Sequence, residues 1–390
     1  MKPELEKLVT RARTLFDDLD LEAVRSWKNA MPDRKAIGHL PVWAPRELIW
    51  AAGMLPVSVL GGGDRLEIIR GDAYFQSYIC HFPRSTVELA LSGRLDALDG
   101  MLFPSICDVI RNLSGMWQML FPDLYVRYLD LPQNFDLEVG GRFWRHELEA
   151  LMRDLEALAG RPISEDDLRL SIAAFAANRH AVHRLYRARS REPWLFPADE
   201  MYIVLRAGCV LPPDEHTELV ERYLELAPGE AERQRQDRSR IVVAGMFCEQ
   251  PPLGLLLTLE RAGCFIVDDD LFLALRWPEV EVEITDPPLE GLIEAFLRQG
   301  ALSASVYQPD GKRGAWLVES VERNHAEGVI FCAPSFCDPA LLEQPMLVAA
   351  LDESSVPHTQ FKYSEDTGQF AAIREQAGTF ADSIRLWGEA

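Results

Sequence analysis

Short apolar runs alternate with longer segments of helical periodicity along most of the chain. The runs predict strands at 35–42, 55–63, 96–104 and 124–132, and again at 240–248, 264–270, 327–334 and 356–363. Each run is apolar throughout instead of alternating with polar residues, which is typical of parallel strands buried on both faces of a sheet. The pattern therefore predicts an α/β fold.

The segments between these runs predict helices. One covers residues 1–29, where apolar residues recur at helical spacing, and others cover 44–53, 252–263 and 369–387. A long helical stretch at 142–191 is broken near 160–162, and SEDD at 164–167 is a capping sequence for its second part. We interpret REPWLFP (191–197) as the connection between two halves of the chain.

An internal repeat supports a duplication. DGMLFPSICD (99–108) and EGVIFCAPSFCD (327–338) share an acidic residue and Gly, an apolar strand, and Pro-Ser-x-Cys-Asp. We expect two duplicated doubly wound parallel-sheet domains, flavodoxin-like or Rossmann-like, at 35–197 with a helical connection and at 198–390, after an N-terminal helical segment at 1–34. Cys107 and Cys337 then follow carboxyl ends of strands, where open α/β sheets bind ligands. Two facing units would bring both thiols to one cleft.

Charge and composition exclude several classes of function. The 390 residues include 40 Lys and Arg against 61 Asp and Glu, a net charge of −21, which disfavours binding to nucleic acid or to an anionic membrane surface. The charged N-terminus has no signal-peptide core, and no apolar run is long enough for a membrane span. We expect a cytoplasmic protein whose seven cysteines are thiols, core residues or metal ligands, not disulfides.

The cysteines differ in their surroundings. Cys332, within a strand, and Cys264, at a strand start, fit core packing, while Cys248 is a weaker site candidate beside Glu249. Cys107, Cys337 and Cys80, which precedes a Pro-Arg-Ser turn, stand next to polar residues at the ends of elements. Thiols converging from three segments suit a cluster or a metal better than a nucleophile, although burial as core residues remains the plain alternative.

Other patterns add little. There is no GxxxxGK[ST] motif, so this chain is not expected to hydrolyse ATP itself. His180 and His183 lie three residues apart in a predicted helix, where we interpret them as surface or core histidines.

Several long segments resemble one protein family. YICHFPRSTVELALSGRLDALDGMLFPSICDVIRN (78–112), EGVIFCAPSFCDPALLEQP (327–345) and GQFAAIREQAGTFADSI (368–384) are similar to the 2-hydroxyacyl-CoA dehydratase and benzoyl-CoA reductase family, and the resemblance covers nearly the whole chain. PSICDVIRNLSGMW, FCEQPPL and REQAGTFADSI are most similar to the smaller of the two non-ATPase subunits of its ATP-dependent reductases.

The resemblance implies a cofactor and partners. By motif, Cys80, Cys107 and Cys337 would hold a [4Fe–4S] cluster, and Cys332 is not an expected ligand. The implied activity is the ferredoxin-linked, ATP-dependent reduction of benzoyl-CoA by two electrons to a cyclic dienoyl-CoA, in anaerobic aromatic degradation. The implied partners are a homologous larger subunit, a cluster-bridged pair of ATPase subunits, ferredoxin and the aromatic acyl-CoA substrate.

Three alternatives stay open at this point. The chain could belong to a 2-hydroxyacyl-CoA dehydratase, to a methylbenzoyl-CoA reductase, or be a cluster-free two-domain binding subunit. No motif identifies the proton donor. Asp108, Glu249, His81 and Tyr78 are candidates by their sequence position alone, and Asp108 fits the start of a helix equally well.

Overall fold

The computed structural model describes residues 1–245, 250–276, 282–299, 312–364 and 369–387. Within them, the strands form two four-stranded sheets in which every pairing is parallel, with the orders β2-β1-β3-β4 and β6-β5-β7-β8. The strands of the first sheet are β1 (Ala36–His39), β2 (Leu55–Ser58), β3 (Gly100–Pro104) and β4 (Tyr125–Leu129). Those of the second are β5 (Ser239–Ala244), β6 (Cys264–Asp269), β7 (Gly328–Pro334) and β8 (His358–Tyr363). The predicted α/β class and its duplicated doubly wound sheets are confirmed.

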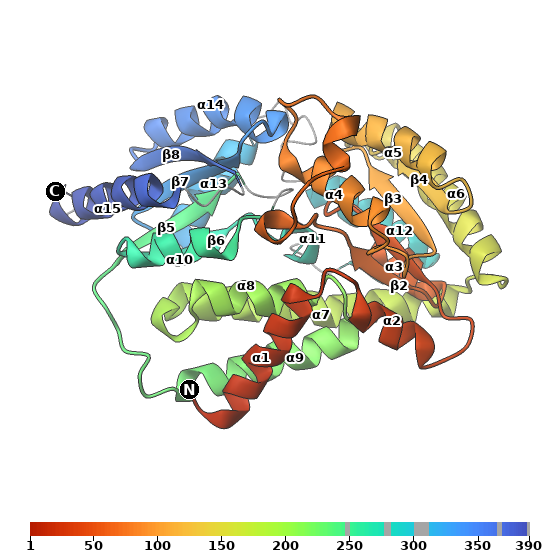
Figure 1. The fold of residues 1–390 in the computed structure, drawn as a ribbon, viewed down its shortest axis with the longest axis horizontal. Helices are drawn as coiled ribbons and strands as arrows, with labels where there is room; N and C mark the ends of the chain where they lie inside the picture. Colours follow the sequence, from red (N-terminus) through yellow and green to blue (C-terminus); the bar gives the residue numbers. More distant parts are fainter. Residues whose placement is uncertain (246–249, 277–281, 300–311, 365–368, 388–390) are drawn as a thin grey trace.

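Helices cover both sheets (Figure 1). The first half contains α1 (Pro3–Asp17), α2 (Glu22–Asn29), α3 (Arg46–Ala51), α4 (His81–Leu91), α5 (Asp108–Leu120), α6 (Gly140–Ala159), α7 (Glu165–Arg191), α8 (Ala198–Ala207) and α9 (Pro213–Leu226). The second contains α10 (Leu253–Arg261), α11 (Leu273–Arg276), α12 (Pro288–Gln299), α13 (Lys312–Arg323), α14 (Asp338–Glu353) and α15 (Phe370–Trp387). Single 3₁₀ turns stand at Gly63–Arg65, Gly71–Tyr74, Pro193–Leu195 and Ala227–Gly229. Of the described helices, none is long and apolar enough to cross a membrane.

The acidic residue and Gly at the start of each repeat motif have the same role in both sheets. The Asp99 carboxylate accepts a hydrogen bond from the N–H of Ala36 at the start of β1 (2.8 Å), and Glu327 accepts one from the N–H of Arg240 in β5 (2.6 Å). A Cβ on Gly100 would lie 2.8 Å from the Tyr125 ring, and one on Gly328 would lie 2.9 Å from the Pro357 carbonyl oxygen. A side chain at either position would collide with its neighbour. The absence of a Cβ therefore lets β4 approach β3 closely at Gly100, and lets the residue before β8 approach β7 closely at Gly328.

Two of the edge strands depart from the predicted pattern. Both inner strands of each sheet are almost completely buried, but β4 is half-buried along most of its length and β8 exposes several side chains. All four outer strands have a single neighbour, but β2 and β6 are nearly as buried as the inner strands, whereas β4 and β8 leave side chains open to water. The expectation of strands buried on both faces holds for the inner strands and is wrong for β4 and β8.

The N-terminal prediction of one helix over 1–29 is wrong. The chain forms α1 and α2 with a break between them, where Leu21 has a φ of 55°. The Asp18 carboxylate accepts hydrogen bonds from the backbone N–H groups of Glu22 and Ala23, both at 3.0 Å, and so caps the start of α2. An acidic residue at this position satisfies N–H groups that a continuous helix would bond internally.

A layer of helices joins the two sheets. The segment 191–197 does not lead straight into the second sheet, because α8 and α9 intervene before β5. The helices α1, α7, α8 and α9 pack together, and Figure 1 shows them side by side in the lower part of the view. The helix α7 also contacts α3 below the first sheet and β6 of the second, so it bridges both.

One helix of the second half packs on the first. Phe296 of α12 stacks against Phe135 and tilts against Trp144 of α6, and it belongs to the same buried cluster as the first sheet. The domain limits after residues 34 and 197 remain a prediction, since the elements near them share buried clusters across those limits.

The predicted cap of the second long helix is present. The Ser164 hydroxyl accepts from the N–H of Asp167 (3.1 Å), and the Asp167 carboxylate accepts from the N–H of Ser164 (3.0 Å). We expect Ser164→Ala to lower the free energy of unfolding by about 1 kcal/mol, because the N–H of Asp167 at the helix start loses its acceptor, the Ser164 hydroxyl. Urea unfolding checks this, with Ser26→Ala as a control within another helix. An unchanged midpoint for Ser164→Ala would contradict the prediction.

Candidate functional site

The three cysteines singled out by sequence each stand at the start of a helix. Cys80 is the N-cap residue of α4, Cys107 that of α5, and Cys337 that of α14. The predicted turn after Cys80 is wrong, because Pro83 lies within the first turn of α4, where proline is tolerated. A thiol at a helix start faces backbone N–H groups that favour its anionic form.

Cys107 and Cys337 end the two copies of the repeat in the same way. The N–H of Ser105 donates to the carbonyl of Leu129 at the end of β4, and the N–H of Ser335 donates to that of Tyr363 at the end of β8. Each serine thus ties its motif to the neighbouring edge strand, at 2.9 and 2.7 Å respectively. The cysteine two residues later is thereby held just beyond the carboxyl end of β3 or β7.

The two motifs lie close to one another in space. Cys337 is 6% exposed and belongs to the buried cluster that surrounds the first sheet, and Cys107 packs against the same cluster. Burial raises the pKa of the Cys107 thiol, the N–H groups of Ile110 and Val109 lower it, and the carboxylates of Asp108 and Asp338 raise it. Asp338 comes from the second copy, so the start of α14 is near the start of α5.

Cys107 opens into a cavity of about 480 Å³ at the carboxyl ends of β3 and β4. Its apolar wall includes Leu131, Val139 and Phe143. Its polar lining includes Ser105, Cys107, Asp108, Arg111, Tyr128 and Asp130. A cavity of this size with a few convergent polar groups is typical of a small-molecule site. It is the position at which doubly wound sheets bind ligands.

Hydrogen bonds hold the polar side of this cavity in place. The Ser105 hydroxyl accepts from the N–H of Leu131 (2.9 Å), and the Arg111 Nε donates to the Tyr128 hydroxyl (3.3 Å) with the guanidinium over the ring. Sequence reasoning missed Tyr128 and Asp130. Their position at the end of the strand that neighbours β3 is the signal that would have found them.

The remaining candidates are dispersed. Asp108 is exposed at the cavity, His81 is half-buried as the first residue of α4, and Tyr78 is 63% exposed two residues before Cys80. Glu249 and Cys248 lie outside the described residues. Cys332 and Cys264 are completely buried, and burial raises the pKa of the Cys264 thiol to about 12, in keeping with core packing. No three His, Cys, Asp or Glu side chains stand close enough to hold a metal ion, among the residues that the structure describes.

Comparison with known proteins agrees with the resemblance seen in the motifs. The model of the family described as 2-hydroxyglutaryl-CoA dehydratase, D-component, matches residues 41–384. A benzoyl-CoA reductase subunit from Thauera aromatica is 52% identical over 97% of this chain and 98% of the relative. The beta subunit of (R)-2-hydroxyglutaryl-CoA dehydratase from Acidaminococcus fermentans is 30% identical over 90% of this chain and 93% of its own length. The beta subunit of (R)-phenyllactyl-CoA dehydratase from Clostridium sporogenes is 26% identical over 90% and 92%.

All three relatives are named as subunits of acyl-CoA reductases or dehydratases, and each is matched over nearly its full length. The family match begins just after β1 and ends within α15, so it includes both copies of the repeat and all three N-cap cysteines. The expected family is therefore confirmed: this chain belongs to the 2-hydroxyglutaryl-CoA dehydratase D-component family, as a component of an oxidoreductase or dehydratase complex.

Proposed function

We propose that this chain is the iron–sulfur subunit of an ATP-dependent benzoyl-CoA reductase of the cytoplasm. The observation that carries the proposal is the 52% identity to a benzoyl-CoA reductase subunit along 97% of the chain, against 30% or less to the dehydratase subunits. Its proposed partners are a homologous larger subunit, a pair of ATPase subunits, ferredoxin as electron donor and the aromatic acyl-CoA.

Cys80, Cys107 and Cys337 are the proposed cluster ligands. The donor set fits, because [4Fe–4S] clusters are held by thiolates and each of these cysteines is the N-cap residue of a helix, where the helix start favours negative charge. A bound cluster with three protein thiolates would supply low-potential electrons and one iron free to accept an oxygen ligand.

The side chains around Cys107 would shape the rest of the site. Leu131 and Phe143 offer an apolar wall for an aromatic ring and keep water from it. Asp108 is exposed at the cavity and can exchange protons with solvent, so it is the proposed proton carrier on this chain. Tyr78 and His81 are weaker candidates for this role, since neither lines the described cavity, and Glu249 is a candidate by its sequence position alone.

A dehydratase subunit is the second candidate, because the family model and the 30% identical relative both carry that activity in their names. The reductase consumes electrons, whereas the dehydratase removes water with no net reduction. We would therefore assay the anaerobically purified complex with reduced ferredoxin and ATP, on benzoyl-CoA and on a 2-hydroxyacyl-CoA.

Oxidation of two equivalents of ferredoxin per dienoyl-CoA formed would support the reductase. Water loss without net oxidation would overturn it in favour of the dehydratase. A ring-methylated benzoyl-CoA in the same assay distinguishes a methylbenzoyl-CoA reductase. If the triple variant with Ser at positions 80, 107 and 337 keeps full colour and activity, the cluster-free binding subunit takes first place.

A further inference from the structure

A second cavity, of about 820 Å³, shares no lining residue with the one at Cys107. It lies between the C-terminal half of α7, the end of β6 and the end of α13. The only carboxylate in its described lining is that of Asp268. Its cationic lining consists of Arg184, Arg187, Arg191, Arg240, Arg276 and Arg323. Six arginines in one hollow are unexpected on a chain with a net charge of −21.

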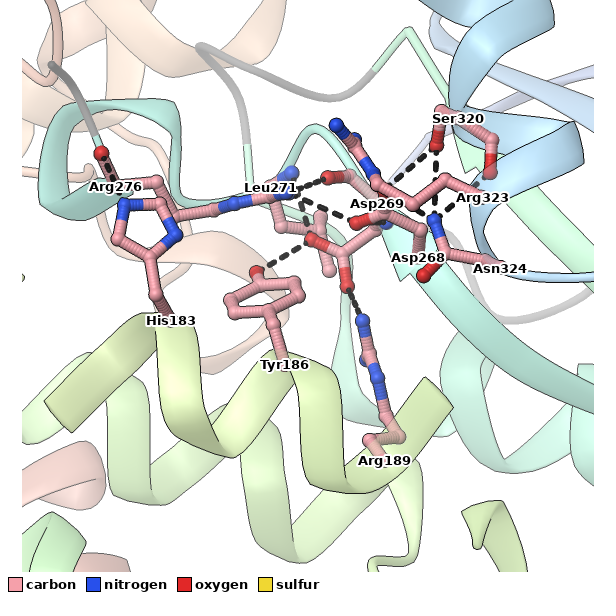
Figure 2. A network of polar contacts seen from close by, with 10 residues as sticks. All are labelled: His183, Tyr186, Arg189, Asp268, Asp269, Leu271, Arg276, Ser320, Arg323 and Asn324. Carbon is pink, nitrogen blue, oxygen red and sulfur yellow. Dashed lines mark hydrogen bonds and ion pairs between the residues drawn. The ribbon is translucent and has the colours of Figure 1, made fainter. Parts of the chain in front are cut away.

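The floor of this cavity is a closed network of ion pairs and hydrogen bonds (Figure 2). The Asp269 carboxylate accepts from the Tyr186 hydroxyl (2.8 Å) and from Arg189 (2.7 Å), both on α7. The Asp268 carboxylate accepts from Arg276 (2.9 Å), the Ser320 hydroxyl (2.6 Å) and Asn324 (3.1 Å). The carboxylate oxygens of both residues thus already accept hydrogen bonds from buried donors. They neutralise little of the positive charge of the exposed arginines at the rim of the cavity.

The rim carries positive charge that the described structure does not neutralise. Arg187 and Arg191 are exposed on α7, four residues apart, and neither makes an ion pair or hydrogen bond in the described part of the chain. Like charges at this spacing on a helix repel. Arg184, by contrast, donates to Glu221 at 2.6 Å. Arg323 joins the rim from α13, half exposed and 3.8 Å from the already occupied Asp268.

The shape of the site limits what can bind there. The cavity is concave and has the volume of a small-molecule site, so a small molecule fits it better than the flat surface of a partner protein would. Guanidinium groups bind phosphate oxygens through paired N–H donors, and several of them converging in one hollow match a ligand with more than one phosphate. The exposed histidines His180 and His325 add further donors at the rim.

We infer that this pocket binds a small ligand with two or more phosphate groups, through Arg187, Arg191 and Arg323. The diphosphate of a free nucleotide and that of coenzyme A offer the same chemistry. The inference does not depend on the reductase proposal, because it rests on the charge and shape of this cavity alone.

Calorimetric titration of the full-length chain with inorganic pyrophosphate tests this inference. We expect saturable binding at low ionic strength that weakens as salt is added. The double variant Arg187→Gln/Arg191→Gln is expected to weaken binding by at least about tenfold, because two charge-assisted contacts are lost. The matched control is Lys7→Gln/Arg153→Gln, which removes two exposed helical cations outside the cavity and is expected to bind as the unaltered chain does.

Loss of binding in the double variant counts only if the protein is folded. Arg187 and Arg191 are exposed and have no carboxylate partner within the described residues, so circular dichroism melting is expected to be unchanged. Absence of pyrophosphate binding, or equal binding by the double variant, would overturn the inference. Titration with ADP and with coenzyme A then separates the two sources, and either ligand supports the inference if the double variant weakens its binding. A complex that is inactive on benzoyl-CoA would leave this result unaffected.

Discussion

Replacing Cys107 by Ser is expected to remove most of the iron and acid-labile sulfide from the anaerobically purified complex. Cys107 is the proposed ligand that both borders the described cavity and shares a buried cluster with Cys337, so its loss leaves the cluster two thiolates on this chain. About four iron and four sulfide per cluster are expected beforehand. Chemical iron and sulfide analysis measures the change, and reductase activity is expected to fall with it.

Two features make this substitution a sharp test. Ser is a favoured N-cap residue, so α5 is expected to remain folded and the loss of iron cannot be attributed to a lost helix start. Cys332→Ala is the matched control, because Cys332 is a buried thiol in the strand that leads to Cys337. Full iron in the Cys107→Ser protein would refute ligation by Cys107, as would equal loss in the control.

Asp269→Ala is expected to lower the free energy of unfolding by about 3–5 kcal/mol. The substitution leaves the Arg189 guanidinium, whose side chain is 4% exposed, without its carboxylate, and the buried Tyr186 hydroxyl without its acceptor. A buried charge deprived of its partner keeps its desolvation cost and loses its compensation. Urea unfolding followed by far-UV circular dichroism measures the effect.

The matched control is an exposed ion pair. Glu225→Ala removes one of the two carboxylate partners of Arg222, in a pair whose side chains are 47% and 64% exposed, and is expected to cost less than about 1 kcal/mol. If Asp269→Ala proves as mild as Glu225→Ala, the network in Figure 2 does not hold α7 against the second sheet.

Much of the fold could be predicted because its signals are local. Apolar runs located the strands, and the repeat correctly placed Cys107 and Cys337 just past the carboxyl ends of two of them. The helix α8 was missed because nearly all its residues are buried, so its sequence has no polar face to reveal a helical period. The helix α9 was also missed, although Pro213 and the acidic residues after it are typical of a helix start.

The sites divide in the same way. The thiols were found because each stands in a recognisable motif, whereas Tyr128 and Asp130 join the Cys107 cavity only through the pairing of β3 with β4. The arginine pocket could not be predicted, because its cations come from α7, β5, α11 and α13, which are separate segments of the sequence. His180 and His183, interpreted as surface or core residues, both line that pocket.

The packing of α12 on α6 has a consequence for how this chain unfolds. Phe296, from the second half, fills part of the core built around the first sheet, and α7 spans both halves from below. A protease cut between α9 and β5 would therefore leave two fragments that still hold each other, as in a non-covalent complex. We expect the two halves to unfold together in a single cooperative transition. The duplication seen in the sequence and the topology would then not produce two separate unfolding steps.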